Sequence, residues 1–352
     1  MPLRIAIVGA GAVGGYVGAY LTAAGEDVAL IDPWPEHVAL IRSEGLRIEE
    51  LAPEQGFTQR LRALHLSEAQ GLVREAPVDI AFIAVKSYDT AWATALIKPY
   101  LAPDGIVVAL QNGINEETIA EVVGWPRTLG CVPARIAVEL YAPGRIRRSV
   151  PRGGTDLTVF RVGELHGRVT PRLQALAALI GKVDTVKLTT NLWGERWSKL
   201  CVNGMRNGLA AATGLAGNDI DRIEAVRRFG IRLGGEAVRI GQALGYQLEE
   251  IYNLEAEPLA RAHEGDPAAL AAVEAILLAA TRSNSRSDLQ RPSMGQDIVK
   301  GRRTEIDEIN GLIAARGREI GLPVAAHEAL AEIVRRIQRG ELAPSPTLLP
   351  TL

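Results

Sequence analysis

Residues 4–15 read Arg-Ile-Ala-Ile-Val-Gly-Ala-Gly-Ala-Val-Gly-Gly, and this stretch decides the fold. Apolar, mostly β-branched residues run directly into a Gly-x-Gly-x-x-Gly pattern, and a helical pattern follows from Tyr16 to Ala24. We therefore expect a strand, a tight turn and a helix. Gly9 allows a sharp turn, Gly11 lets a pyrophosphate approach the backbone, and Gly14 lets the helix pack close to the strand.

The turn also has the properties of a phosphate site. The N–H groups at the start of a helix, together with the positive end of its dipole, attract an anion. The predicted cofactor-binding residues of this turn are Gly9, Ala10, Gly11, Ala12, Val13 and Gly14.

A second apolar strand, residues 28–31, ends in Asp32, which lies 18 residues after Gly14. This is about the spacing of the carboxylate that binds the ribose of a dinucleotide. The combination predicts a dinucleotide-binding protein. The alternative is a glycine-rich turn of an α/β protein that binds no nucleotide.

Asp32 favours NAD(H) as the cofactor. A carboxylate accepts hydrogen bonds from both ribose hydroxyls and repels a 2′-phosphate, which usually meets an arginine. Pro33 and Trp34 follow, and neither carries a positive charge. NADP(H) is the alternative, because Lys86 or Arg42 could supply that charge.

Composition limits the class of protein. The chain has 352 residues, enough for two domains, and its 47% hydrophobic and 23% charged residues are typical of globular proteins. A net charge of −2 without a long basic run indicates neither nucleic acid nor a membrane surface as a partner. The short cluster Arg145–Arg148 is interpreted as a solvated strand edge.

Cysteine and histidine usage points away from a metal centre. Cys131 and Cys201 are far apart and are expected to be small buried residues in a reducing compartment. The five histidines lack ligand spacing. The chain enters a core strand at once, and it contains no apolar run of about 18 residues, so we expect neither a signal peptide nor a membrane span. The predicted location is cytoplasmic.

The pattern along the chain predicts an α/β fold with two domains. Residues 78–85 and 106–110 have the continuous apolar character of central parallel strands. Ligands bind at the carboxyl ends of such strands, so the loops that hold Lys86 and Asn112 are expected beside the cofactor. Shorter strands follow over 131–162 and a last one over 183–188.

Beyond residue 188 the pattern becomes almost wholly helical. The expected helices cover 192–213, 222–244, 267–281, 304–320 and 326–339. We therefore predict a Rossmann-type dinucleotide-binding domain over residues 1–189, an all-helical substrate and catalytic domain over 190–342, and a Pro-rich tail over 343–352, loose or docked on the surface.

Two clusters of polar residues could carry chemistry. Lys199, Asn203 and Asn207 recur every four residues and so share one stripe of a partly apolar helix. The alternative for this stripe is a solvated face with capping and structural asparagines. The second cluster holds Ser293 and Glu305, and its alternative is the charged start of a helix, where acids are favoured.

With these motifs together, the chain resembles the ketopantoate reductase (2-dehydropantoate 2-reductase) family along almost its whole length. The similarity lies in residues 9–14, 85–90, 111–113, 197–200 with Asn203 and Asn207, 293–297, and 304–307 with residues 310–311. The resemblance implies a Rossmann domain joined to a helical domain, and hydride transfer from a reduced nicotinamide to the ketone of a 2-keto acid. The default reaction is the reduction of 2-dehydropantoate to pantoate, a step of pantothenate biosynthesis.

The resemblance also assigns roles. It implies that Lys199 is the catalytic lysine, which polarises the ketone and delivers the proton, and that Glu305 is catalytic through its support of the site and of the substrate hydroxyl. Asn203, Asn207 and Ser293 would bind the substrate. Asn112 would lie between nicotinamide and substrate, and Lys86 near the cofactor. A homodimer is possible.

Two features separate the chain from compact NADP-dependent members of that family. Asp32 is followed by proline rather than by a basic residue, and the segment 249–291 is longer. Both favour an alternative activity, an NAD-dependent dehydrogenase of a different 2-hydroxy acid or related alcohol. A more remote alternative is a dinucleotide-binding sensor without turnover, which would be expected to lack Lys199 or Glu305.

Overall fold

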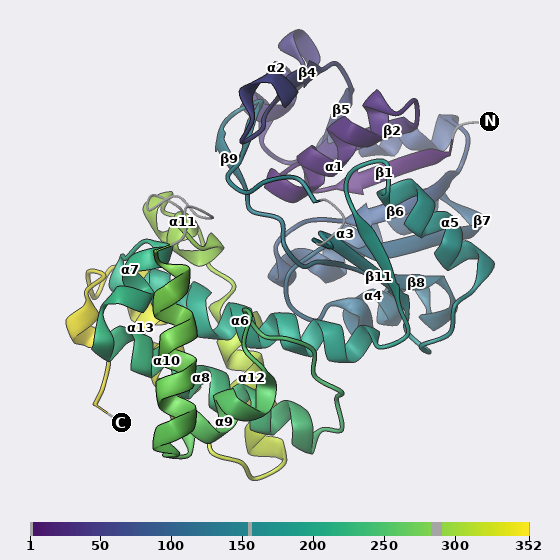
Figure 1. Ribbon diagram of the computed structural model, residues 1–352. Coiled ribbons are helices and arrows are strands. Elements are labelled where there is room, and N and C mark those ends of the chain that lie inside the picture. The colour runs from purple at the N-terminus through teal and green to yellow at the C-terminus, as the bar shows by residue number, and fades with distance from the viewer. Residues whose placement is uncertain (1–2, 154–156, 283–290, 352) are drawn as a thin grey trace. The chain divides into compact units, whose positions relative to one another are not determined.

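The computed structural model of the protein describes residues 3–153, 157–282 and 291–351. The chain divides into two compact units, Met1–Leu192 and Trp193–Leu352. Figure 1 draws the first from purple to teal and the second from teal to yellow. Of the longer segment 249–291, residues 283–290 lie outside the described residues.

An eight-stranded sheet forms the centre of the first unit. Its order is β12-β11-β8-β7-β6-β1-β2-β5, and its strands are parallel except that β11 and β12 run antiparallel to the rest. The strands are β1 (Arg4–Val8), β2 (Asp27–Asp32), β5 (Arg62–His65), β6 (Val78–Ile83), β7 (Leu101–Ala109), β8 (Thr128–Pro133), β11 (Phe160–Glu164) and β12 (Val186–Thr189).

Helices cover both faces of this sheet. Because alternate residues of each strand point to opposite sides, each strand contributes to two cores. Ile5 and Ile7 of β1 belong to a core with helices α1 (Ala12–Ala23) and α5 (Pro171–Ile180). Ala6 and Val8 belong to a second core with α3 (Thr90–Ile97) and α4 (Glu116–Val123). Helix α2 (Pro35–Glu44) follows β2. This is the doubly wound arrangement that the continuous apolar strands predicted.

A second, four-stranded sheet of order β4-β3-β10-β9 completes the first unit. Its strands are β3 (Leu46–Glu49), β4 (Phe57–Gln59), β9 (Val138–Ala142) and β10 (Arg145–Arg148). Ile146 of β10 and Ile48 of β3 belong to the same core as α1.

The interpretation of Arg145–Arg148 as a solvated strand edge is wrong. Strand β10 is an interior strand, parallel to β3 on one side and antiparallel to β9 on the other. Arg145 and Arg147 are exposed, but Arg148 is only 1% exposed. Its guanidinium contacts the Asp184 carboxylate at 2.6 Å and donates to the Tyr16 hydroxyl at 2.8 Å, and these partners offset the cost of burying its charge.

The second unit is helical in its described residues. Its helices are α6 (Leu192–Thr213), α7 (Gly217–Arg222), α8 (Glu224–Ala243), α9 (Ala256–His263), α10 (Pro267–Ala280), α11 (Ser293–Val299), α12 (Leu312–Glu319) and α13 (Ala325–Gln338). No helix among the described residues is both long and apolar enough to cross a membrane.

The helix predicted over 222–244 is found as α8, Glu224–Ala243. One expected helix differs from the structure at its start. The helix predicted over 304–320 begins later, with a π-helical turn, Asp307–Gly311, in front of α12. The tail is docked in part, because the Ser345 N–H donates to the Ala212 carbonyl at 2.9 Å.

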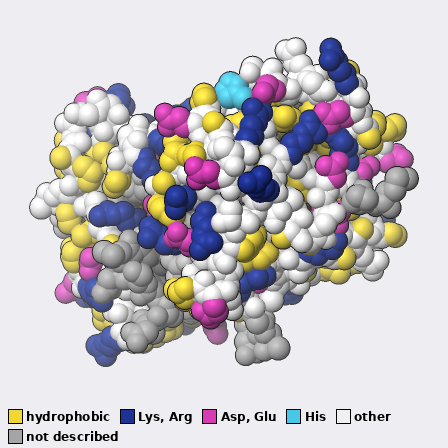
Figure 2. Space-filling view, turned by 90° about the horizontal axis from the view of Figure 1, so that it is seen from above, with side chains coloured by type: hydrophobic (Ala, Val, Ile, Leu, Met, Phe, Trp, Pro, Cys, Tyr) yellow, Lys and Arg dark blue, Asp and Glu magenta, His cyan; other side chains and the backbone are white. Residues whose placement is uncertain are grey.

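Both cysteines are buried, as expected. On the face of the molecule drawn in Figure 2, basic and acidic side chains are intermixed, in keeping with a net charge near zero.

Candidate active site

The turn between β1 and α1 has the geometry that its glycines predict. Gly9 has a φ of +100°, and a Cβ there would lie 2.7 Å from the backbone of Ala84 and Val85. A Cβ on Gly14 would lie 2.0 Å from the Gly9 carbonyl oxygen. These two positions therefore require glycine for the turn and for the packing of the helix.

Gly11 has a different environment. A Cβ there would meet no atom within 4 Å, so the space beside this residue is open. Gly11 is the N-cap of α1, no side chain caps the helix, and its first turn holds no acid. The first N–H groups of a helix have no carbonyl partner within it. The turn thus fits an anionic pyrophosphate.

Asp32 ends β2 next to this turn. One carboxylate oxygen accepts from the Ala10 N–H at 2.8 Å, and the other accepts from the Trp34 N–H at 2.9 Å. Each oxygen has lone pairs for further donors, so the carboxylate fits a ribose with two free hydroxyls. Arg42, one of the two cations considered for a 2′-phosphate, instead donates to the Ala63 carbonyl at 2.7 Å and pairs with Glu68.

The loops after β6 and β7 are tied together. The Ser87 hydroxyl donates to the Asn112 carbonyl at 3.1 Å, and the Asn115 amide donates to the same carbonyl at 2.7 Å. The Gln111 amide donates to the Val85 carbonyl at 2.9 Å. Lys86 and Asn112, both half-buried, therefore lie on neighbouring loops at the carboxyl ends of the strands. Ser87 and Asn115, which fix these loops, were not singled out from the sequence, although Asn115 follows Asn112 by three residues.

Helix α6 carries the polar stripe of the second unit. Asn203 and Asn207 are buried and Lys199 is half-buried. The Asn207 amide donates to the Ser293 hydroxyl at 3.2 Å, at the first residue of α11. The structure thus brings together two predicted substrate-binding residues that are 86 positions apart in the sequence. The burial of the two asparagines argues against a solvated face at these positions, whereas a structural role for them is compatible with it.

Glu305 lies just before the π-helical turn and is 3% exposed. A residue of another element binds the neighbouring backbone: the Thr304 N–H donates to the side chain of Gln338, at the end of α13, at 2.6 Å. Asn310, within the turn, donates to the Gly204 carbonyl of α6 at 3.0 Å. The segment that carries Glu305 therefore packs against the helix that carries Lys199. π-Helical turns are rare and occur frequently at functional sites.

The predicted residues thus form two groups, one in each unit. The first group holds the glycine turn, Asp32, Lys86 and Asn112. The second group holds Lys199, Asn203, Asn207, Ser293 and Glu305. Among the described residues, no cluster of three or more His, Cys, Asp or Glu side chains could hold a metal ion.

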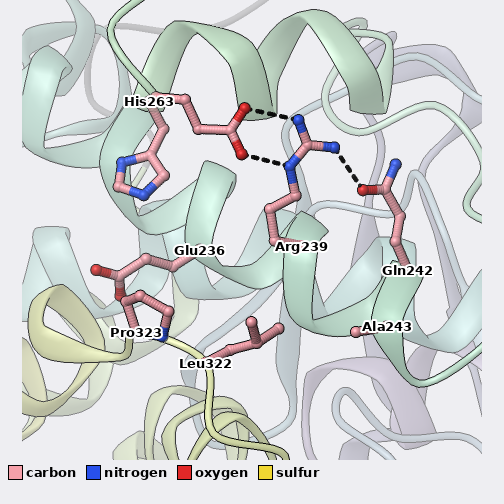
Figure 3. A pocket seen from close by; sticks show the side chains of 8 residues that line it. Glu236, Arg239, Gln242, Ala243, His263, Leu322 and Pro323 are labelled. Carbon is pink, nitrogen blue, oxygen red and sulfur yellow. Dashed lines mark hydrogen bonds and ion pairs between the residues drawn. The ribbon is translucent and has the colours of Figure 1, made fainter.

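A pocket of about 550 Å³ lies elsewhere in the second unit, and none of the predicted residues lines it. Figure 3 shows Arg239 of α8 across this pocket from His263 and Glu236. Arg239 contacts the Glu264 carboxylate at 2.6 Å and the Glu257 carboxylate at 2.7 Å, which lowers the pKa of both acids. Its guanidinium is thus already engaged by carboxylates of this unit.

The parallel sheet, the glycine turn at a helix start and the carboxylate after β2 define a Rossmann-type dinucleotide-binding protein. Comparison with known families specifies it further. The family described as ketopantoate reductase PanE/ApbA matches residues 5–160, and the C-terminal domain of that family matches residues 191–338. The chain belongs to the ketopantoate reductase family, and the predicted fold class and the enzyme class of that family are confirmed.

Individual relatives agree with this assignment. A 2-dehydropantoate 2-reductase of Halobacterium salinarum is 29% identical, covering 96% of this chain and 99% of its own. The crystal structure of a PanE/ApbA family ketopantoate reductase from Ralstonia eutropha is 30% identical with a TM-score of 0.76, covering 96% of this chain and 99% of that one. A D-mandelate dehydrogenase solved with NADH and anilino(oxo)acetate has the same fold, with a TM-score of 0.77 at 23% identity, over 96% of this chain and 99% of that one.

Proposed function

We propose that this protein transfers hydride from NAD(P)H to the ketone of a 2-keto acid, with 2-dehydropantoate as the default substrate and pantoate as the product. The observation that carries the proposal is the buried polar stripe of α6, linked to α11 by the bond between Asn207 and Ser293. Ligand sites typically place a small number of polar side chains in a mostly apolar lining, and the stripe has this character.

Each residue of the stripe has a task in this reaction. When bound, the reduced nicotinamide supplies the hydride. As the carbonyl double bond becomes a single bond, negative charge gathers on the oxygen, and the Lys199 ammonium stabilises that charge and delivers a proton to it. Solvent then returns a proton to Lys199. Asn203, Asn207 and Ser293 would orient the keto acid, and Glu305 would hold the substrate hydroxyl.

We infer that NAD(H) is the preferred cofactor. The Asp32 carboxylate, held by the N–H groups of Ala10 and Trp34, suits a ribose with free hydroxyls and repels a phosphate. Arg42, one candidate for binding that phosphate, is paired with Glu68. Lys86 and Asn112 would contact the cofactor from the loops after β6 and β7.

An assay of the purified protein tests these assignments. Ketopantoate is supplied with NADH and with NADPH separately, and the loss of nicotinamide absorbance is followed. We expect faster oxidation of NADH, and a loss of about 10²–10⁴-fold in kcat for Lys199→Ala, the range of a general acid. Unchanged turnover in Lys199→Ala would contradict the role of this lysine. A preference for NADPH would contradict the role of Asp32.

If this protein binds NADH but does not turn over ketopantoate, the result would support the alternative, a dehydrogenase of a different 2-hydroxy acid. The structural feature behind this alternative is the segment that includes α9 and α10, which precedes Ser293 in the sequence. A panel of other 2-keto and 2-hydroxy acids would then identify the substrate. The homodimer and the cytoplasmic location stay predictions, and the mass of the protein in solution tests the first.

A further inference from the structure

Asn310 is fully buried in the π-helical turn that follows Glu305. Its side-chain nitrogen lies 3.0 Å from the Gly204 carbonyl of α6 and 3.0 Å from Nδ1 of His327 on α13. An amide nitrogen has two hydrogens, so both donors of Asn310 are used. One side chain thus connects the turn after Glu305 to two helices.

The contact with α6 depends on two glycines. A Cβ on Gly204 would lie 2.9 Å from Ile313 and 3.2 Å from His327, and a Cβ on Gly208 would lie 3.0 Å from the Asn310 side-chain oxygen. The bare backbone of α6 therefore lets Asn310 reach a helix carbonyl. Gly204 directly follows Asn203, and Gly208 directly follows Asn207, so the contact fixes α6 beside its polar stripe.

His327 determines which way the Asn310 amide points. Nε2 of His327 lies 2.9 Å from the Leu233 carbonyl and must donate to it, which leaves Nδ1 as an acceptor for Asn310. The His327 backbone is held as well, because the Glu236 carboxylate accepts from the N–H groups of Ala326 at 3.1 Å and His327 at 3.4 Å. Glu236 also borders the pocket of Figure 3.

The oxygen of Asn310 has no hydrogen-bond partner among the described residues. A buried acceptor that is left unpaired is unfavourable, and such groups are rare in folded proteins. A hydrophobic side chain would avoid this cost, but it could not donate to Gly204 and His327. Asparagine at position 310 therefore places the turn through two hydrogen bonds, at the cost of one unpaired buried oxygen.

We propose that Asn310 is a positioning residue for the reduction, which holds the segment of Glu305 in register with the polar stripe of α6, and that His327 fixes the orientation of the Asn310 amide. This inference rests on the proposed function, because it assigns Glu305 and Lys199 to the same site. Asn310 acts through Glu305 and does not itself contact the substrate.

The test is a double-mutant cycle between Asn310 and Glu305. We expect Asn310→Leu to lower kcat by about 10–100-fold, since small misplacements of a catalytic group have effects of this size. The Kd for NADH should change by less than about 2-fold, because the cofactor residues lie in the other unit. In a Glu305→Gln background, Asn310→Leu should change kcat by less than about 2-fold, because residues that act as a unit are not additive.

Two further variants separate positioning from folding. Asn310→Asp keeps the shape of the side chain, but its carboxyl group has no donor when ionised and only one when protonated, so it should lower kcat as Asn310→Leu does. Thr213→Val is the matched control, because the buried Thr213 hydroxyl donates to the Leu209 carbonyl at 2.6 Å within α6 and Thr213 is not among the residues assigned to the site. We expect this control to keep kcat within about 2-fold of the parent even where it lowers the melting temperature.

The outcomes are distinct. Full activity of both Asn310 variants, or effects of Asn310 and Glu305 that multiply in the double variant, would overturn the inference while leaving the proposed function intact. Parent-like turnover in Lys199→Ala and Glu305→Gln would overturn the proposed function, and the positioning role with it. A loss of kcat that disappears in the Glu305→Gln background supports both.

Discussion

At the scale of the residue, the surroundings of His327 make it neutral. It is fully buried, and desolvation lowers its pKa from 6.5 to about 4. The titratable residue Glu328 follows it on the same helix. The charge of His263 on α9 also lowers the pKa of His327. The neutral form is the one that accepts from Asn310, so the same burial serves the proposed positioning role.

This burial predicts a pH dependence of stability. Above about pH 6.5 His327 is neutral in both the folded and the unfolded chain, and it contributes no pH dependence. Between about pH 6.5 and about pH 4 only the unfolded chain binds the proton, so the free energy of unfolding falls as the pH falls. The full effect is on the order of 3 kcal/mol.

Urea denaturation of the parent and of His327→Gln at about pH 7.5 and about pH 5 measures this effect. The parent should lose more stability than the variant between the two pH values, since glutamine does not titrate. Equal losses would show that His327 does not govern the acid sensitivity. Comparing the two proteins cancels the contributions of other titrating groups to the pH dependence, among them Glu236, whose pKa is raised by burial.

At the scale of the element, the β1–α1 turn combines two kinds of glycine. Gly14 is required by packing, because a Cβ there would lie 2.0 Å from a backbone oxygen and 2.8 Å from the Ala84 side chain. Gly11 is not required by packing, since nothing lies within 4 Å of its Cβ position. Its backbone is also compatible with alanine, with a φ of −62°. A need for glycine at position 11 would therefore come only from the approach of the cofactor.

The two glycines should therefore respond differently to alanine. Gly14→Ala should destabilise the protein by about 1–3 kcal/mol or more, as overpacking does in a tight core. Gly11→Ala should keep the stability of the parent and weaken NADH binding by about 10-fold or more. Thermal unfolding and a fluorescence titration with NADH measure these two properties. NADH binding by Gly11→Ala with parent affinity would show that the pyrophosphate does not approach this residue.

At the scale of the whole molecule, a buried polar network joins the two sheets of the first unit. Arg148 of β10 contacts Asp184 and Tyr16, and the hydroxyls of Tyr16 and Tyr20 both donate to the Glu50 carboxylate at 2.6 Å. Burial and the bond to Glu50 raise the pKa of Tyr20 to about 12. The network connects β10, α1 and the residues before β12, so it fixes the small sheet on the Rossmann core.

Breaking this network should have a large effect on stability. Arg148→Met leaves the Asp184 carboxylate buried without its cation, and we expect a loss of about 3–5 kcal/mol. Adding Asp184→Asn should recover part of that loss, because the amide oxygen can still accept from the Gly153 and Thr185 N–H groups.

The neighbouring residue provides the control. Arg147 is exposed and lies 3.6 Å from Glu139, so Arg147→Met should change the stability by about 1 kcal/mol or less. Urea denaturation of the four proteins gives the free energies. If Arg148→Met were as mild as Arg147→Met, the buried pair would not hold the two sheets together.

The sequence alone predicted the local part of this fold. Glycine spacing, continuous apolar strands and helical periodicity depend on neighbours within a few residues, and they placed β1, α1, β2 and α6 correctly. The motifs that resemble the ketopantoate reductase family led to the same architecture and enzyme class. The stripe of Lys199, Asn203 and Asn207 followed from helical geometry, since residues four positions apart share a face.

Contacts between distant segments could not be derived in this way. Arg148 has the same local pattern as its exposed neighbour Arg147, and only pairing of β10 with both β3 and β9 buries it. The π-helical turn before α12, and the approach of Asn310 to Gly204, arise from packing against α6 rather than from local preference. The sequence by itself determined which elements form and which chemistry they can carry. The tertiary structure decided which polar side chains are buried, because burial depends on residues that only the fold brings near. Arg148 and Tyr16 are 132 positions apart, and Asn310 and Gly204 are 106 positions apart.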